Sequence, residues 1–217
     1  MNLSLTGGQS FGKAVNILLL ITALSLAPAA IMLMTSFTRI VIVLSFLRQA
    51  LSVQNVPSAK IISAIALFMT IFIMQPVWST AYNDAIKPFN AKEISQEEAM
   101  IRAIKPFKNF MLRQTRDESL LLFMEMSEIN QVEAATDLPM HIIIPAFIVS
   151  ELKTAFQMGF LIFLPFLVID IIVASTLMSL GMMMLPPTMI ALPFKLLLFV
   201  IIDGWTLMIK SLVLSFN

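Results

Sequence analysis

The chain of 217 residues is 59% hydrophobic and only 12% charged. This excludes an ordinary soluble domain, which is roughly 45–50% apolar and about 25% charged. A net charge of +1, no cysteine and a single histidine leave no electrostatic basis for binding nucleic acid and no residues for disulfides, thiolate catalysis or Cys/His metal sites. We therefore expect no enzyme, no cofactor and no metal.

Two uncharged runs in the first region, residues 1–83, are long enough to cross a membrane. Ala14–Met34 has 21 residues and Ile61–Asn83 has 23, and a helix needs about 20 to cross a hydrocarbon core of roughly 30 Å. Lys13 and the small residues Ala27–Ala30 also allow a signal-peptide interpretation. The first run is longer than the roughly 7–15 apolar residues of a signal sequence, so we expect a retained helix.

The connector between these runs, Thr35–Lys60, is basic and predicts an amphipathic helix followed by a turn at Val56-Pro57-Ser58. If the connector is cytoplasmic, the amino terminus and the following polar segment lie outside. Its first residues, Thr35–Arg39, predict a helix boundary with capping hydroxyls and a positive-inside arginine. The apolar residues at helical spacing are Ile40, Val43, Leu44 and Leu47.

A polar insert, residues 84–137, holds 17 of the 27 charged residues. Ser95–Glu98 and Thr115–Glu118 both match the capping box, in which a hydroxyl and a carboxylate satisfy the free N–H groups at the start of a helix. We therefore expect a small helical unit whose charges form a solvated face.

The third region, residues 138–217, predicts a helical hairpin. Pro186-Pro187 cannot continue a helix, so one limb rises through about residues 142–180 and the other returns through about 190–216. The tip carries Met182, Met183 and Met184. These methionines are either ordinary apolar residues near a turn or, repeated around a ring of subunits, a deformable gasket for a passing polypeptide.

Charged residues interrupt this apolar hairpin, and each costs at least ~2.5–3.5 kcal/mol at the centre of a bilayer. We expect them to pair between helices or subunits, so that the region is stable only when other copies or partner chains cover it. A proton relay in a small-solute transporter is the alternative. We expect His141 to be structural or interfacial. The charges expected to pair are Glu151, Lys153, Asp170, Lys195 and Asp203, and the sixth charge, Lys210, can snorkel near its helix end.

Many short stretches match one known family in the same order along the chain: Thr35–Arg39, Leu47–Leu51, Pro145–Phe147, Ser150–Phe156, Gly159-Phe160, Pro165-Phe166, Asp170, Leu180–Met184, Pro186-Pro187, Pro193–Lys195 and Asp203–Trp205. In these stretches the chain resembles the FliP family, the flagellar relatives of the injectisome SctR proteins. The form of the first stretch and residues 110–116 are similar to the flagellar branch rather than the injectisome one. Family precursors often carry a cleavable signal ahead of a region like Gly7–Ser10, and none is visible, which fits a processed form or a member made without one.

The resemblance implies an all-α core subunit of the flagellar type III export gate. Five copies would assemble with FliQ and FliR into a helical, conical complex, associated with the inner membrane and basal body but largely on the periplasmic side. FlhB, FlhA, the basal-body ring, the proximal rod and exported flagellar subunits are the further expected partners. By resemblance, Met182–Met184 would form the gasket, and Glu151, Asp170 and Lys195 would make helix or subunit contacts.

Overall fold

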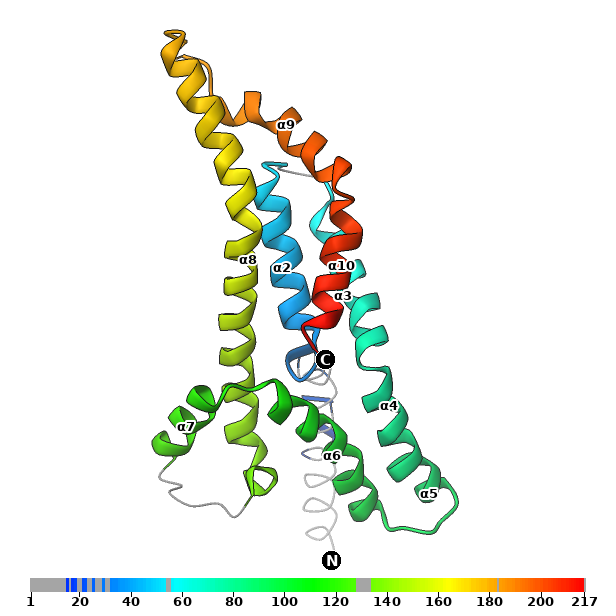
Figure 1. Cartoon of the computed structure of the whole chain (residues 1–217). Coiled ribbons are helices and arrows are strands. Elements are labelled where there is room, and N and C mark those ends of the chain that lie inside the picture. Colours follow the sequence, from blue (N-terminus) through cyan, green and yellow to red (C-terminus); the bar gives the residue numbers. More distant parts are fainter. Residues whose placement is uncertain are drawn as a thin grey trace, which may run out of the picture.

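The computed structural model describes residues 32–53, 56–127, 134–182 and 184–216, and single positions between residues 15 and 29. The described part is helical, without strands, as the sequence predicts (Figure 1). Most of the first apolar run, Ala14–Met34, lies outside the described residues. The elements are α2 (Phe37–Ala50), α3 (Ala59–Ile73), α4 (Gln75–Ala81), the π-helix η1 (Tyr82–Ile86), α5 (Lys87–Asn90), α6 (Gln96–Gln114), α7 (Asp117–Met126), the 3₁₀ helix η2 (Ala135–Asp137), α8 (Met140–Ser179), α9 (Pro187–Ile201) and α10 (Gly204–Leu214).

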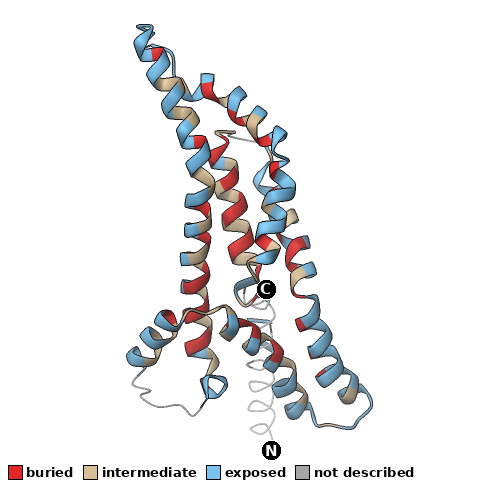
Figure 2. Cartoon of the chain, in the orientation of Figure 1, coloured by how far each residue is buried: buried red, intermediate tan, exposed pale blue. Residues whose placement is uncertain are grey.

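Helix α2 is the centre of the bundle, and α8 runs beside it and beyond it (Figure 1). Its predicted apolar face is confirmed, because Ile40, Val43, Leu44 and Leu47 are all buried (Figure 2). The two helices approach closely at Gly159, where an added Cβ would lie 2.4 Å from the ring of Phe46. A larger residue at Gly159 would therefore push α8 away from α2.

The second apolar run, Ile61–Asn83, is bent rather than straight. Helix α3 ends at Ile73 and the following helical segment turns away by 55°. Pro76 explains the break, because proline has no N–H to donate to the preceding turn and its ring clashes with the carbonyl four residues earlier. The bend leads the chain from the central bundle into the polar insert.

The expected hairpin is present, but its returning limb is divided. Helix α8 forms the rising limb, whereas α9 and α10 meet at a 65° bend. Asp203 adopts the left-handed conformation (φ 50°, ψ 54°) at this bend, and an added Cβ on Gly204 would lie 2.2 Å from the Phe199 ring. A single continuous returning helix would need right-handed helical angles at Asp203. Because Asp203 has left-handed angles, the limb is divided at this residue.

In the insert, the Ser95 hydroxyl cap of one predicted capping box is confirmed, and the other predicted capping box is wrong. The Ser95 hydroxyl accepts a hydrogen bond from the Glu98 N–H at 3.2 Å at the start of α6. The Thr115 hydroxyl instead donates at 2.7 Å to the Met111 carbonyl, which also accepts the Thr115 N–H at 2.9 Å, because Thr115 is the C-cap of α6 and not the N-cap of α7. Helix α7 begins two residues later, with Arg116 preceding it.

Among the described residues, α8 alone is a single helix long and apolar enough to cross a membrane. The bent pairs α3 with α4–α5 and α9 with α10 also meet this criterion if each is counted as one span. Figure 2 shows that much of α8 beyond α2, and most of α9, is exposed. The chain therefore presents long apolar surfaces that it does not cover itself.

Candidate functional site

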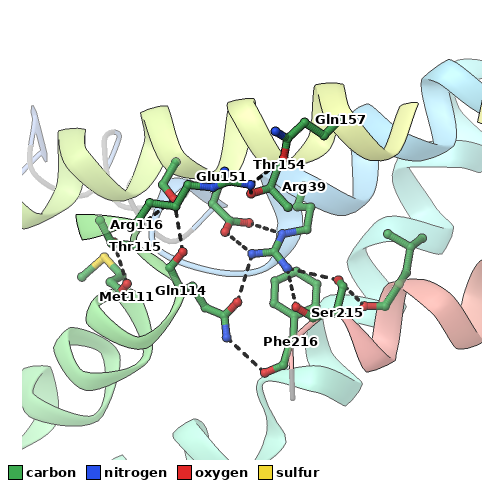
Figure 3. Close-up of polar contacts among 12 residues, drawn as sticks. Arg39, Met111, Gln114, Thr115, Arg116, Glu151, Thr154, Gln157, Ser215 and Phe216 are labelled. Atoms are coloured by element: carbon green, nitrogen blue, oxygen red, sulfur yellow. Dashed lines mark hydrogen bonds and ion pairs between the residues drawn. The ribbon is translucent and has the colours of Figure 1, made fainter. Parts of the chain in front are cut away.

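Arg39 forms a buried ion pair with Glu151 that joins α2 to α8 (Figure 3). The two residues are 2% and 0% exposed. The Arg39 Nε donates to Glu151 Oε2 at 2.9 Å, and Nη2 donates to the other carboxylate oxygen. This two-pronged geometry is the strongest form of an arginine–carboxylate pair.

The same guanidinium holds the end of the chain and the end of α6. Its Nη1 donates to the Ser215 carbonyl at 2.7 Å and hydroxyl at 3.1 Å, and Nη2 donates to Gln114 Oε1 at 3.0 Å. The Gln114 amide in turn donates to the Phe216 carbonyl at 3.1 Å, and the Phe216 ring stacks on the guanidinium at 3.9 Å (Figure 3). We call Arg39, Gln114, Glu151, Ser215 and Phe216 the Arg39 network.

A second set of bonds fixes the α6–α7 junction to α8. The Ser150 hydroxyl donates to the Gln114 carbonyl at 3.2 Å and accepts from the Arg116 N–H at 3.0 Å. The Arg116 guanidinium donates to Thr154 at 3.2 Å and to Gln157 at 2.5 Å (Figure 3). The polar insert is thus attached to the same side of α8 that carries Glu151.

Lys153 lies at the exposed edge of this junction. Its Nζ donates to Glu118 Oε2 of α7 at 2.7 Å. The hydrogen bond from Lys153, with its positive charge, holds the pKa of the exposed Glu118 carboxyl below its ordinary value. This predicted charge therefore makes a contact between two helices of one chain.

Lys195 and Asp170, from α9 and α8, form the other charged cluster. The Lys195 Nζ donates to Asp170 Oδ2 at 2.7 Å, to the Ser52 hydroxyl at 2.7 Å and to the Ala50 carbonyl at 3.1 Å. Ala50 is the last residue of α2, where a positive charge offsets the partial negative charge of the helix end. Lys195 therefore links α9 to both α8 and α2.

Asp203 stands apart from these clusters. It is exposed at the bend before α10, and it makes no ion pair with any residue in the described ranges. Its predicted contact with another helix or subunit stays a prediction. His141, near the start of α8, is likewise exposed.

The sequence reasoning missed the role of Arg39, which it interpreted as a positive-inside arginine. A signal was available, because Arg39 precedes the buried Val43 by four residues and Leu47 by eight. Residues at these spacings share one helix face, so Arg39 was bound to lie on the apolar side of α2. A buried and paired arginine says little about which side of a membrane a loop occupies.

The methionine tip lies at the far end of the hairpin (Figure 1). Gly181 turns the chain with a φ of +74°, a conformation that favours glycine, and nothing lies within 4 Å of where its Cβ would be. Met182 is 42% exposed and Met184 is 98% exposed. Met183 lies outside the described residues.

Metal binding has no support in the described ranges, where no three Asp, Glu or His side chains converge on one point. An apolar groove of about 440 Å³ lies between α8 and α9 below the tip, with Ile172, Leu177 and Phe194 in its lining. The site therefore consists of the ion pairs and hydrogen bonds around α2 and of an apolar arm, formed by the end of α8, the tip and α9, that carries the methionines.

Comparison with known proteins assigns the chain to a family. The sequence model of the FliP family matches residues 20–212. The chain is 51% identical to the flagellar biosynthetic protein FliP of Pectobacterium carotovorum subsp. carotovorum over 97% of its length and 81% of the relative's. It is 51% identical to the protein of that name from Bacillus subtilis (96% and 94%) and 48% identical to the one from Borreliella burgdorferi (100% and 86%). The chain therefore belongs to the FliP family.

Proposed function

We propose that this chain is a channel-forming subunit of the flagellar type III protein export gate, passing unfolded flagellar subunits through a pore closed by methionines. Its relatives are named flagellar biosynthetic proteins, so the coarser statement, a component of the flagellar export apparatus, follows from the family. The finer statement rests on the tip. Its carrying observation is the exposure of Met184, whose side chain its own chain leaves almost wholly uncovered.

An exposed thioether at the end of a projecting hairpin would be stabilised if other copies covered it. Burial of apolar side chains is favourable by about 25 cal/mol per Å², and methionine adapts to irregular surfaces. Tips from several copies that meet at one axis would bury Met182, Met183 and Met184 against one another. Such a constriction excludes ions and widens for a polypeptide of any sequence.

The flanks of the hairpin support assembly with copies and partners. Large apolar side chains such as Phe160, Ile171 and Val200 are exposed on α8 and α9. We infer a homopentamer that binds FliQ and FliR along these faces, with FlhB, FlhA, the basal-body ring and the proximal rod around it. The complex belongs to the inner membrane and flagellar basal body, largely on the periplasmic side.

Replacement of Met182, Met183 and Met184 together by alanine tests the gasket in the assembled complex. Because alanine is much smaller, the closed constriction should leak, and we expect an ion conductance at least about tenfold above that of the unchanged complex. The measurement is single-complex conductance in a planar bilayer. Met100→Ala is the matched control, since Met100 is also exposed but lies on α6 in the insert.

Unchanged conductance in the triple variant, with the complex intact, would contradict the gasket. A proton-coupled transporter is less well supported, because Asp170 and Lys195 pair with each other and with the end of α2. That alternative predicts that Asp170→Asn abolishes transport and spares assembly, whereas the gate predicts impaired assembly. An injectisome role is disfavoured by relatives that carry flagellar names at about half identity.

A further inference from the structure

One side of the polar insert is an acidic helix. Helix α7 contains Asp117, Glu118 and Glu125 and no basic residue. Glu118 is paired with Lys153, while Asp117 and Glu125 form no ion pair in the part of the chain that the structure describes. We call the exposed side of this helix the acidic face, made of Asp117, Leu121, Leu122, Glu125 and Met126.

The other side of the polar insert carries a basic groove between α4 and α6. Two adjoining cavities of about 450 and 700 Å³ share Thr80, Pro106 and Asn109 in their linings. Arg102, Lys105 and Arg113 of α6 line this groove, against one acidic residue, Asp84 of η1. Arg102 is partly neutralised by Glu98 at 2.5 Å, whereas Lys105 and Arg113 make no ion pair in the described ranges. We call this cleft the α4–α6 groove.

Among the described residues, the unpaired acidic residues of the acidic face and the unpaired basic residues of the α4–α6 groove have the same spacing along their helices. Asp117 and Glu125 are eight residues apart on α7, and Lys105 and Arg113 are eight residues apart on α6. At 1.5 Å per residue, each pair spans about 12 Å of helix. Two carboxylates on one helix can therefore meet two cations on the other at once, with Leu121 and Leu122 between them.

Within one chain these surfaces do not face each other, because α7 and the α4–α6 pair extend to opposite sides of the insert (Figure 1). Two complementary surfaces on opposite sides of one subunit generate a head-to-tail contact, which closes into a ring when the rotation allows. Opposite potentials also favour one orientation of approach and disfavour like-charged alternatives.

We propose that α7 of one copy of this chain lies in the α4–α6 groove of the next copy. Asp117 and Glu125 pair with Lys105 and Arg113 of the neighbour, and the exposed leucines of α7 cover the apolar part of the groove around Val77 and Leu112. The proposal rests on the proposed assembly of several copies. It adds the pair of surfaces through which neighbouring copies would contact each other head to tail.

A charge-exchange experiment on the full chain, extracted in mild detergent, tests this contact. Asp117→Lys with Glu125→Lys reverses the acidic face, and Lys105→Glu with Arg113→Glu reverses the groove. We expect each reversal to weaken assembly about tenfold or more, measured by native mass at a series of concentrations, and the four changes together to restore it. Glu93→Lys with Glu97→Lys is the control, since it makes the same charge change elsewhere on the insert.

A cross-linking measurement keeps the test independent of folding defects. The chain has no cysteine, so Leu121→Cys and Asn109→Cys in one chain should give covalent dimers and higher ladders on mild oxidation. Either cysteine alone should give far less product. Both positions are exposed, which favours normal folding of these variants.

The outcomes separate this proposal from the proposed function. Assembly that survives both reversals, or that fails without rescue by the four changes together, overturns the contact while the gate remains. An equal loss in the Glu93 and Glu97 control, or no ladder from the paired cysteines, also overturns it. A chain that is monomeric when unchanged contradicts the proposed assembly itself.

Discussion

The two ends of the bundle satisfy their polar groups in different ways. Around the Arg39 network, four segments of the chain supply donors and acceptors, and the ion pair is fully covered. The arm above it, formed by the end of α8, the tip and α9, is tied back by Lys195, and Asp170 keeps 29% of its side chain exposed. The chain therefore satisfies its own polar groups around Arg39, whereas Asp170 in the arm stays partly exposed.

The largest expected effect comes from breaking the Arg39 network. Arg39→Met leaves the Glu151 carboxylate buried without its partner, and such a change costs about 3–5 kcal/mol of unfolding free energy. This loss of unfolding free energy is measured by unfolding the detergent-extracted complex and monitoring the loss of its helical circular-dichroism signal. Arg48→Met on the same helix is the control, because Arg48 is only partly buried and makes no ion pair in the described residues.

The double variant Arg39→Met with Glu151→Leu sharpens this prediction. Removing both charges leaves no uncompensated ion, so the double variant should be more stable than Arg39→Met alone. A double variant less stable than the single one would show that the charges are not the main contribution of this pair.

A smaller effect is expected at the tie of the upper arm. Lys195→Met removes the donor to Asp170, Ser52 and Ala50, but the Asp170 side chain is 29% exposed rather than fully buried like Glu151, so we expect a smaller loss of about 1–3 kcal/mol of unfolding free energy. Lys210→Met, at an exposed lysine on α10, should change little. A loss at Lys195 larger than that of Arg39→Met would reverse the comparison between the two ends.

The smallest effect is expected at the exposed pair of Glu118 and Lys153, where surface ion pairs contribute little. Because Lys153 lowers the pKa of folded Glu118, its stabilisation is present above the ordinary carboxyl pKa and is lost as the pH falls through the lowered value. Unfolding midpoints of the unchanged chain and Glu118→Gln should therefore differ slightly at neutral pH and converge in acid. A difference that grows in acid would contradict this sign.

The helical spacing of apolar residues predicted most of the fold, because the buried face of a helix must be apolar along its length. The apolar face of α2 and the start of α6 at Ser95 follow from spacing and capping that act within one helix. The bends at Met74 and Asp203 were missed, although Pro76 is a local signal for the first; no comparable signal marks the left-handed backbone of Asp203. The partner of Arg39 lies 112 residues away in the sequence, and helical periodicity can place Arg39 on a buried face without naming Glu151.

The methionine tip is the opposite case, because its proposed role comes from composition and resemblance and depends on other copies of the chain. Gly181 and Pro186-Pro187 predict the turn, and the structure has one there. Whether tips meet depends on surfaces of several chains, which the periodicity of one sequence does not encode.

The central claim, that tips of several copies meet at one axis, is tested most directly by a single cysteine at the tip. In a chain without other cysteines, Met184→Cys should form disulfide-linked dimers in the assembled complex on mild oxidation, because neighbouring tips would lie within bonding reach. Phe68→Cys, exposed on α3, is the comparison position. Dimers at residue 184 and few at residue 68 are the predicted result, and a chain that stays monomeric at 184 while the complex remains intact would contradict the account.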